Sequence, residues 1–246
     1  MTDAPLQASD ERPTDEAPGR PTGADLTDPV FRDGVTALLG VLAYGELKSF
    51  FATVDDARMA PGVHLKGVLA TFAVREFEHY EALLARLREL DVDPQAAMDP
   101  VAPAIDEWHR RTTPKNWMEG LMKAYAGQSI ATDFYRECAD WVDPVSRTLM
   151  LEVLGDNEAA IFVEQQLREA IDQDEKVAGK LALWGRRLVG EALTQAQLTI
   201  AENEALEGFL IAGGSEHGMT LQQLSELFIR ITDAHTARME TLGLSA

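Results

Sequence analysis

The chain has 246 residues, a formal net charge of −19, 46% hydrophobic residues and one cysteine. Such an acidic surface repels phosphate backbones and acidic lipids, and therefore disfavours a nucleic-acid substrate. The single Cys138 excludes an intrachain disulfide framework and a cysteine-based zinc site. The start of the sequence lacks a signal-peptide pattern, and we find no uninterrupted apolar run near the roughly 20 residues that span a bilayer. We therefore expect a cytoplasmic protein without a membrane segment.

The composition favours helices, because Ala, Leu and Glu are abundant and no convincing alternating strand pattern is present. The predicted class is all-α. Residues 1–27 contain four prolines and few large apolar side chains, so we interpret them as a disordered acidic tail. Residues 28–246 form the predicted helical domain.

The first predicted helix begins at Asp28-Pro29, where Asp can cap the first amides and Pro needs no hydrogen-bond partner. Glu46 interrupts its apolar face. The second predicted helix runs from Pro61 to about Leu90. Its inward stripe consists of residues three or four apart: Leu65, Leu69, Phe72, Glu76, His79, Leu83, Leu87 and Leu90.

Residues 91–112 are a long connection, which predicts a crossover along a helical bundle, with a short helix at 105–110. The third predicted helix opens at Thr113-Pro114, and the fourth extends from Asp143-Pro144 to about residue 172. A fifth helical region spans 174–211, bends near Gly190 and stops at Gly213-Gly214. The last helix begins at Thr220, with Gln223 at capping-box spacing.

Two polar residues at the centre of the second stripe, Glu76 and His79, are spaced as Glu-x-x-His. This spacing places a carboxylate and an imidazole side by side, as on the inward face of di-iron four-helix bundles. Glu46 precedes Glu76 by about the same interval as Gln128 precedes Glu158, so the first four helices read as two similar hairpins. The candidate metal ligands are Glu46, Glu76, His79, Glu158 and Gln128.

The second hairpin does not repeat the full ligand set. In the register of Glu158, Ile161 stands where a second His is expected, and a register starting at Asp156 places Ala159 there. Gln128 stands where a carboxylate is expected. Carboxylates and imidazole suit iron, so the pattern predicts one iron ion rather than two. In the alternative, metal-free interpretation, Glu46, Glu76 and His79 pair with each other and with Gln128.

Over about residues 30–240 the chain resembles the ferritin-like proteins related to the tRNA-modifying hydroxylase MiaE, in particular their actinobacterial branch. The resemblance rests on four strings: Ala43-Tyr44-Gly45-Glu46, Glu76-Phe77-Glu78-His79, residues 131–137 (ATDFYRE) and residues 181–192 (LALWGRRLVGEA). It implies a four-helix ferritin-like bundle with two further helical segments. It also implies a non-haem di-iron centre, oxygen-dependent hydroxylation and a tRNA partner. Glu46, Glu76 and His79 match the pattern for one iron.

Three functions remain open from the sequence. The first is a non-haem iron oxidoreductase or hydroxylase with an incomplete second iron site. The second is a metal-free structural bundle, and the third is an interaction protein that uses its C-terminal helices as a partner surface. Local basic clusters at 109–111 with Lys115, and at 186–187, are interpreted as ordinary helix-end and surface charge. The sequence leaves a homo-oligomer open.

Overall fold

The computed structural model describes residues 23–155, 157–211 and 219–245. In these residues the chain forms ten α-helices and one 3-10 helix, η1 (Gly23–Thr27), and the β-structure they contain is an isolated bridge between Ile211 and Met219. The all-α prediction is confirmed. Of the predicted tail, residues 1–22 lie outside the described residues, while Gly23–Thr27 form η1, where Leu26 packs against the core.

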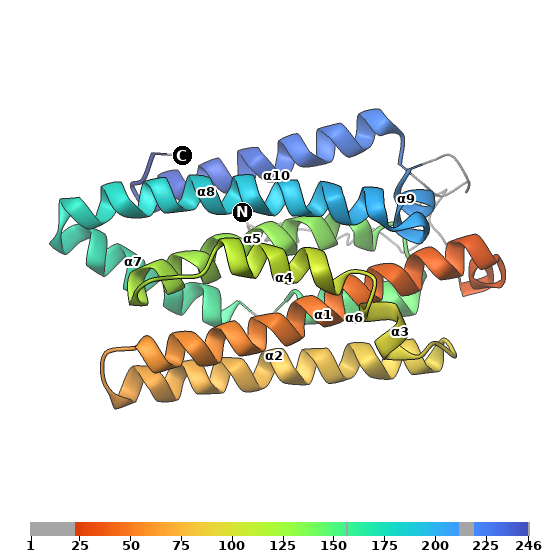
Figure 1. The fold of residues 1–246 in the computed structure, drawn as a ribbon, viewed down its shortest axis with the longest axis horizontal. Helices are drawn as coiled ribbons and strands as arrows, with labels where there is room; N and C mark the ends of the chain where they lie inside the picture. Colours follow the sequence, from red (N-terminus) through yellow and green to blue (C-terminus); the bar gives the residue numbers. More distant parts are fainter. Residues whose placement is uncertain (1–22, 156, 212–218, 246) are drawn as a thin grey trace, which may run out of the picture.

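The longest helices, α1 (Pro29–Met59) and α2 (Val63–Glu89), lie side by side and antiparallel (Figure 1). The start of α1 is as predicted, because the Asp28 carboxylate accepts a 3.0 Å hydrogen bond from the Val30 N–H. The start of α2 is two residues later than predicted. Pro61 lies in the turn, and Gly62 adopts φ 93°, a left-handed conformation that favours glycine.

The connection after α2 is a crossover, as expected, and not a tight turn. It contains α3 (Pro94–Met98) and α4 (Ala102–Arg111), and α4 packs against α1 and α8 (Figure 1). The predicted short helix at 105–110 is therefore the C-terminal part of a longer helix. Its length brings Trp108 and His109 to the interior of the bundle, where both line a cavity described below.

The next three helices are α5 (Trp117–Ala139), α6 (Pro144–Val153) and α7 (Glu158–Gln173). The predicted cap at Thr113 is wrong, because α5 begins after Asn116, whose side chain accepts from the Glu119 N–H at 3.1 Å. The predicted continuous helix from residue 144 to 172 is also wrong. It is interrupted after Val153, and α7 restarts at Glu158. Asp143 starts α6 as expected and accepts from Arg86 of α2 at 2.9 Å, which joins the two hairpins.

The C-terminal helices are α8 (Glu175–Glu202), α9 (Glu204–Leu210) and α10 (Leu221–Thr241). The helix α8 continues without interruption through Gly190, where a bend was predicted, and the helical region is broken at Asn203. The Asn203 side chain accepts from the Leu206 N–H and starts α9. The predicted stop at Gly213-Gly214 lies outside the described residues. The capping box of Thr220 and Gln223 is confirmed, with hydrogen bonds of 3.1 and 2.8 Å.

The apolar core is divided into two parts along the bundle. One part gathers around α1, with Phe31, Leu39 and Leu83 fully buried, and the other lies between α5, α7 and α8, around Met122 and Leu167. By length and composition α1 is apolar enough to cross a membrane, but half of its most apolar window is buried inside the bundle. A core helix passes the same test, so its hydrophobicity has a structural explanation.

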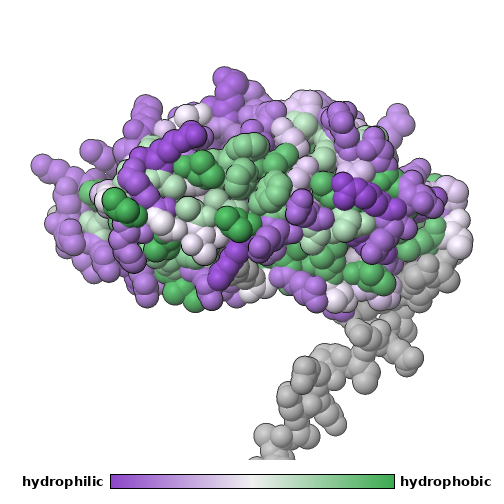
Figure 2. Space-filling view, turned by 90° about the horizontal axis from the view of Figure 1, so that it is seen from below, coloured by the Kyte–Doolittle hydropathy of each residue, from purple (hydrophilic) through white to green (hydrophobic). Residues whose placement is uncertain are grey.

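The surface seen from the side of α2 carries apolar groups among polar ones (Figure 2). The exposed apolar side chains include Val74 and Phe77 of α2 and Phe51 of α1. Phe50 joins them through ring contacts, with centroids 5.1 Å from Phe51 and 5.5 Å from Phe77. Such surfaces occur at interaction sites. The expected homo-oligomer stays a prediction.

Candidate metal centre

The two hairpin helices α1 and α2 bring Glu46, Glu76 and His79 together. One ligand atom from each residue lies within 4.8 Å of the others. The His79 Nδ1 is 3.3 Å from Glu46 Oε2. Glu76 and His79 are neighbours because residues three apart share a face of α2, and the antiparallel packing of α1 places Glu46 opposite them. The structure thus assembles three of the five predicted ligands.

The cluster is largely removed from solvent. Glu76 is 7% exposed, and the side chains of Glu46 and His79 are 13% and 24% exposed. Burial raises the pKa of Glu46 to about 7. Burial, together with the charge of Glu46 and a hydrogen bond to it, raises the pKa of Glu76 well above its usual range, opposed by His79 and the Ser49 hydroxyl. Both carboxyls therefore keep their protons to higher pH than exposed glutamates do, as adjacent buried acids do.

This donor set suits a divalent cation. Two carboxylates and one imidazole are hard and borderline ligands of the kind that iron and manganese accept, and they leave coordination positions open. A cation would also offset the negative charges of the two ionised carboxylates, which burial otherwise disfavours. The residues present fit one metal ion.

The cluster lies on the wall of a cavity of about 790 Å³, whose lining includes the exposed Phe51 and Arg58. Most of the lining is apolar and comes from α1, α2, α5, α7, α8 and α10. Gln128 of α5 lines the same cavity, as predicted from the hairpin pattern, and so does Tyr135. The Tyr135 phenol oxygen is 3.8 Å from where a β-carbon on Gly45, the neighbour of Glu46, would lie. Burial and the charge of Glu46 raise the pKa of Tyr135.

Glu158 is not in this cluster. Its side chain is 69% exposed and forms an ion pair with Arg75, with 2.7 Å between Glu158 Oε2 and Arg75 Nη1. The helix break before α7 explains this, because it rotates the inward face of α7 onto Ala160, Val163 and Leu167. Ile161, which stood at the expected His position, is 59% exposed.

The structure therefore corrects the register of the second half-site. Asn157 and Ala160 line the cavity and are spaced as the i and i+3 positions of a Glu-x-x-His motif. Both predicted registers, from Glu158 to Ile161 and from Asp156 to Ala159, miss this pair, although Ala159 also lines the cavity; Asp156 itself lies outside the described residues. Within the described part of the chain, no further carboxylate or imidazole joins the three clustered ligands.

The sequence did not identify Tyr135 or Ser49 as residues of the site. Ser49 follows Glu46 by one helical turn, so helix spacing could have identified it. Tyr135 comes from α5, and its proximity to Glu46 depends on how α5 packs against α1, which periodicity alone does not fix.

Comparisons with known proteins agree with this fold. A solved structure, "Protein 19 with aldehyde deformylating oxidase activity from Synechococcus", superposes with a TM-score of 0.67 at 20% identity, covering 90% of this chain and 95% of that one. At this identity the likeness establishes the fold alone. A search of curated protein sequences found no match. The model of a family described as "Ferritin-like domain, actinomycetes" matches residues 29–214. The chain belongs to this actinomycete ferritin-like family.

Proposed function

We propose that this chain is a non-haem iron oxidoreductase that holds one iron ion through Glu46, Glu76 and His79. The observation that carries the proposal is the convergence of these three ligands on the wall of a large, mainly apolar cavity. An iron ion with open coordination positions supplies oxygen-dependent oxidation chemistry. The oxidase activity in the name of the structural neighbour supports the same reaction class.

The chain's own residues would contribute in three ways. Glu46 and Glu76 supply negative charge, and the Ser49 hydroxyl favours the ionised form of Glu76. The apolar lining, with Leu42, Leu69 and Phe72 near these ligands in sequence, excludes water and strengthens the electrostatic interactions inside. The Tyr135 phenol lies near Glu46 and remains protonated at neutral pH, because burial raises its pKa.

The cavity supports an apolar substrate better than the tRNA that the resemblance to MiaE-type hydroxylases implies. The net charge is −19, and the predicted basic clusters are occupied by internal contacts. Arg110 and Arg111 pair with Glu107, and Arg187 donates to the Arg111 carbonyl at 2.6 Å. We therefore propose oxidation of an apolar small molecule by a cytoplasmic protein.

The test is the metal content of protein produced in iron-supplemented medium, followed by oxygen consumption with a chemical reductant. We expect close to one iron per chain, lost in Glu76→Gln. Glu78→Gln is the matched control, because Glu78 lies on the same helix and is exposed. Iron-free protein that folds normally would contradict the proposal. It would instead favour the metal-free bundle, in which the 3.3 Å contact of His79 with Glu46 is a structural hydrogen bond.

A further inference from the structure

A second polar cluster lies in the same cavity, away from the candidate metal ligands. Asp56 follows Glu46 by about 15 Å along the axis of α1, at roughly 1.5 Å per residue. Asp56, Lys123 of α5 and His109 of α4 all line the cavity. The cavity therefore extends from one polar cluster to the other.

Lys123 is 6% exposed, which is rare for a lysine. Its Nζ is 3.2 Å from His109 Nδ1 and lies over the Trp108 ring, 4.6 Å from the centroid. The ammonium carries three donors, and its other hydrogen bond among the described residues is a long one of 3.5 Å to the His109 carbonyl. Lys123 thus retains hydrogen-bonding capacity toward the cavity.

Asp56 is 7% exposed, and no residue in the described ranges donates a hydrogen bond to its carboxyl. Buried carboxyls without a hydrogen-bond donor are unusual, because nothing offsets the free-energy cost of removing them from water. The nearest helix makes room for the group, since a β-carbon at Gly120 of α5 would overlap with the Asp56 carboxyl. A second glycine of α5, Gly127, gives the same room to Trp108, 2.7 Å from where its β-carbon would lie. The structure therefore accommodates an acid here that lacks a protein partner.

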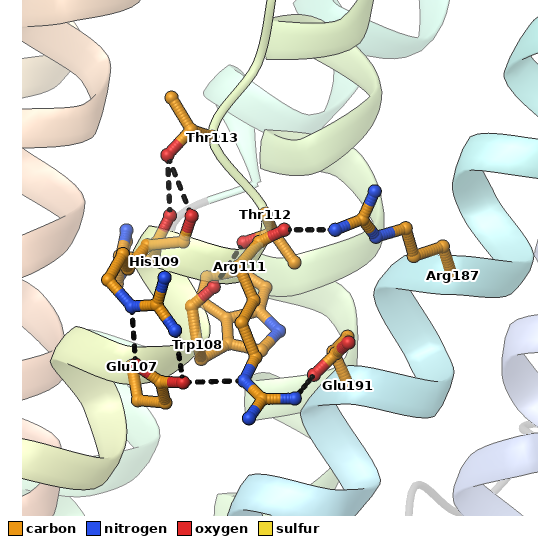
Figure 3. Close-up of polar contacts among 9 residues, drawn as sticks. Glu107, Trp108, His109, Arg111, Thr112, Thr113, Arg187 and Glu191 are labelled. Carbon is orange, nitrogen blue, oxygen red and sulfur yellow. Dashed lines mark hydrogen bonds and ion pairs between the residues drawn. The ribbon is translucent and has the colours of Figure 1, made fainter.

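The C-terminal end of α4, which carries Trp108 and His109, is held by several hydrogen bonds (Figure 3). The Thr112 hydroxyl donates to the Trp108 carbonyl at 2.6 Å, and the Thr113 hydroxyl donates to the His109 carbonyl at 3.2 Å. Arg187 of α8 donates to the Arg111 carbonyl at 2.6 Å. These contacts satisfy the last carbonyls of α4 and hold Trp108 and His109 against the cavity.

The charges indicate what kind of ligand fits. Nearby Lys48 is paired with Asp106 at 2.9 Å, and Arg58 with Asp55 at 2.6 Å. Lys123 and Asp56 thus face the cavity with opposite charges, and burial lowers the pKa of Lys123 to about 8 and raises that of Asp56 to about 7. A charged ligand would add an unbalanced charge, whereas a hydroxyl can donate to Asp56 and accept from Lys123.

We propose that this cavity binds a long-chain alcohol, with its hydroxyl between Asp56 and Lys123 and its apolar chain extending toward Glu46. The apolar lining between the clusters, including Ala52, Leu69 and Phe72, accommodates the chain. The identification of this alcohol as a substrate of the metal centre rests on the proposed function. Binding of the alcohol to the cavity does not depend on the proposed function.

The test measures binding of dodecanol, dodecyl methyl ether and dodecanoate to chelator-treated, metal-free protein by calorimetry and tryptophan fluorescence. We expect dodecanol to bind about tenfold more tightly than the ether, which cannot donate to Asp56, since one net hydrogen bond corresponds to about that factor. Dodecanoate is expected to bind more weakly than dodecanol. Equal binding of alcohol and ether, preference for dodecanoate, or no binding of any of the three would overturn the proposal.

Two variants assign the preference to this cluster. In Asp56→Leu/Lys123→Met, the affinities for alcohol and ether should become equal, because both polar partners are replaced by apolar groups. Glu76→Gln should keep the alcohol preference while losing iron, so failure of the metal site and failure of this proposal are distinguishable. Should the double variant not fold, the three-ligand series on the unaltered protein still decides the question.

Discussion

The two hairpins of this bundle began from similar sequence patterns and differ in what they place in the interior. On α1 and α2, unbroken helices bring Glu46, Glu76 and His79 within 4.8 Å. On α5 to α7, a helix break between Val153 and Glu158 turns the acid of the pattern to the surface. A ligand motif therefore depends on an uninterrupted helix, because a small change of helical phase moves a side chain out of the site.

The largest expected effect on iron content comes from removing one ligand of the site formed by Glu46, Glu76 and His79. His79→Leu removes the imidazole, so we expect iron content to fall to background. Metal analysis of the purified variant checks this. His64→Leu on the same helix is the control, since His64 is exposed and distant from the site in sequence. Full iron content in His79→Leu would rule out this residue as a ligand.

The next largest effect on iron content is expected from rebuilding the ligand set on α5 and α7. Gln128→Glu combined with Asn157→Glu and Ala160→His restores the ligand types at cavity-lining positions, so iron content should rise from about one toward two per chain. The comparison variant carries Gln128→Glu with Ile161→His, on the exposed side of α7, and should stay near one. If iron content rose only in the comparison variant, the second metal position would use the register of Glu158 and Ile161 instead.

The stability of the metal-free protein should depend on pH, because the carboxyl of Glu46 titrates differently in the folded and unfolded chain. The folded state keeps the proton of Glu46 up to about pH 7, whereas the unfolded chain releases it near 4.5. The free energy of unfolding therefore falls as pH rises through this window. Glu76 and Asp56, whose pKa values burial also raises, contribute to the same fall. Glu46→Gln should remove the part that belongs to Glu46 and stabilise the metal-free protein at pH 8 by on the order of 3 kcal/mol, at about 1.4 kcal/mol per pKa unit. Urea unfolding at pH 5 and pH 8 measures it, and equal stability of both proteins at pH 8 would contradict it.

The smallest effect belongs to Glu158. Its exposed ion pair with Arg75 is of the kind worth about 0–1 kcal/mol. Glu158→Gln should therefore change stability by less than about 1 kcal/mol and leave iron content unchanged. A loss of iron in this variant would restore Glu158 as a ligand and contradict the observed register.

The sequence predicted what depends on local periodicity and capping. Asp28, Asp143 and Thr220 start helices as expected, and Glu46, Glu76 and His79 lie together because both stripes are long and regular. The break before α7 was not predicted, because Leu154 and Ile161 keep helical spacing across it, although the string Gly155-Asp156-Asn157 has the composition of a turn. The Asp56–Lys123 cluster was also missed. It combines residues far apart in the sequence, and its burial depends on Gly120 of a neighbouring helix.

The central claim is that one metal ion binds between Glu46, Glu76 and His79. The most direct measurement is anomalous X-ray scattering at the iron edge from crystals of the protein loaded with ferrous iron. We expect one peak per chain, within coordinating distance of all three side chains and not of Glu158. No peak at these residues, or two peaks of equal occupancy, would contradict it.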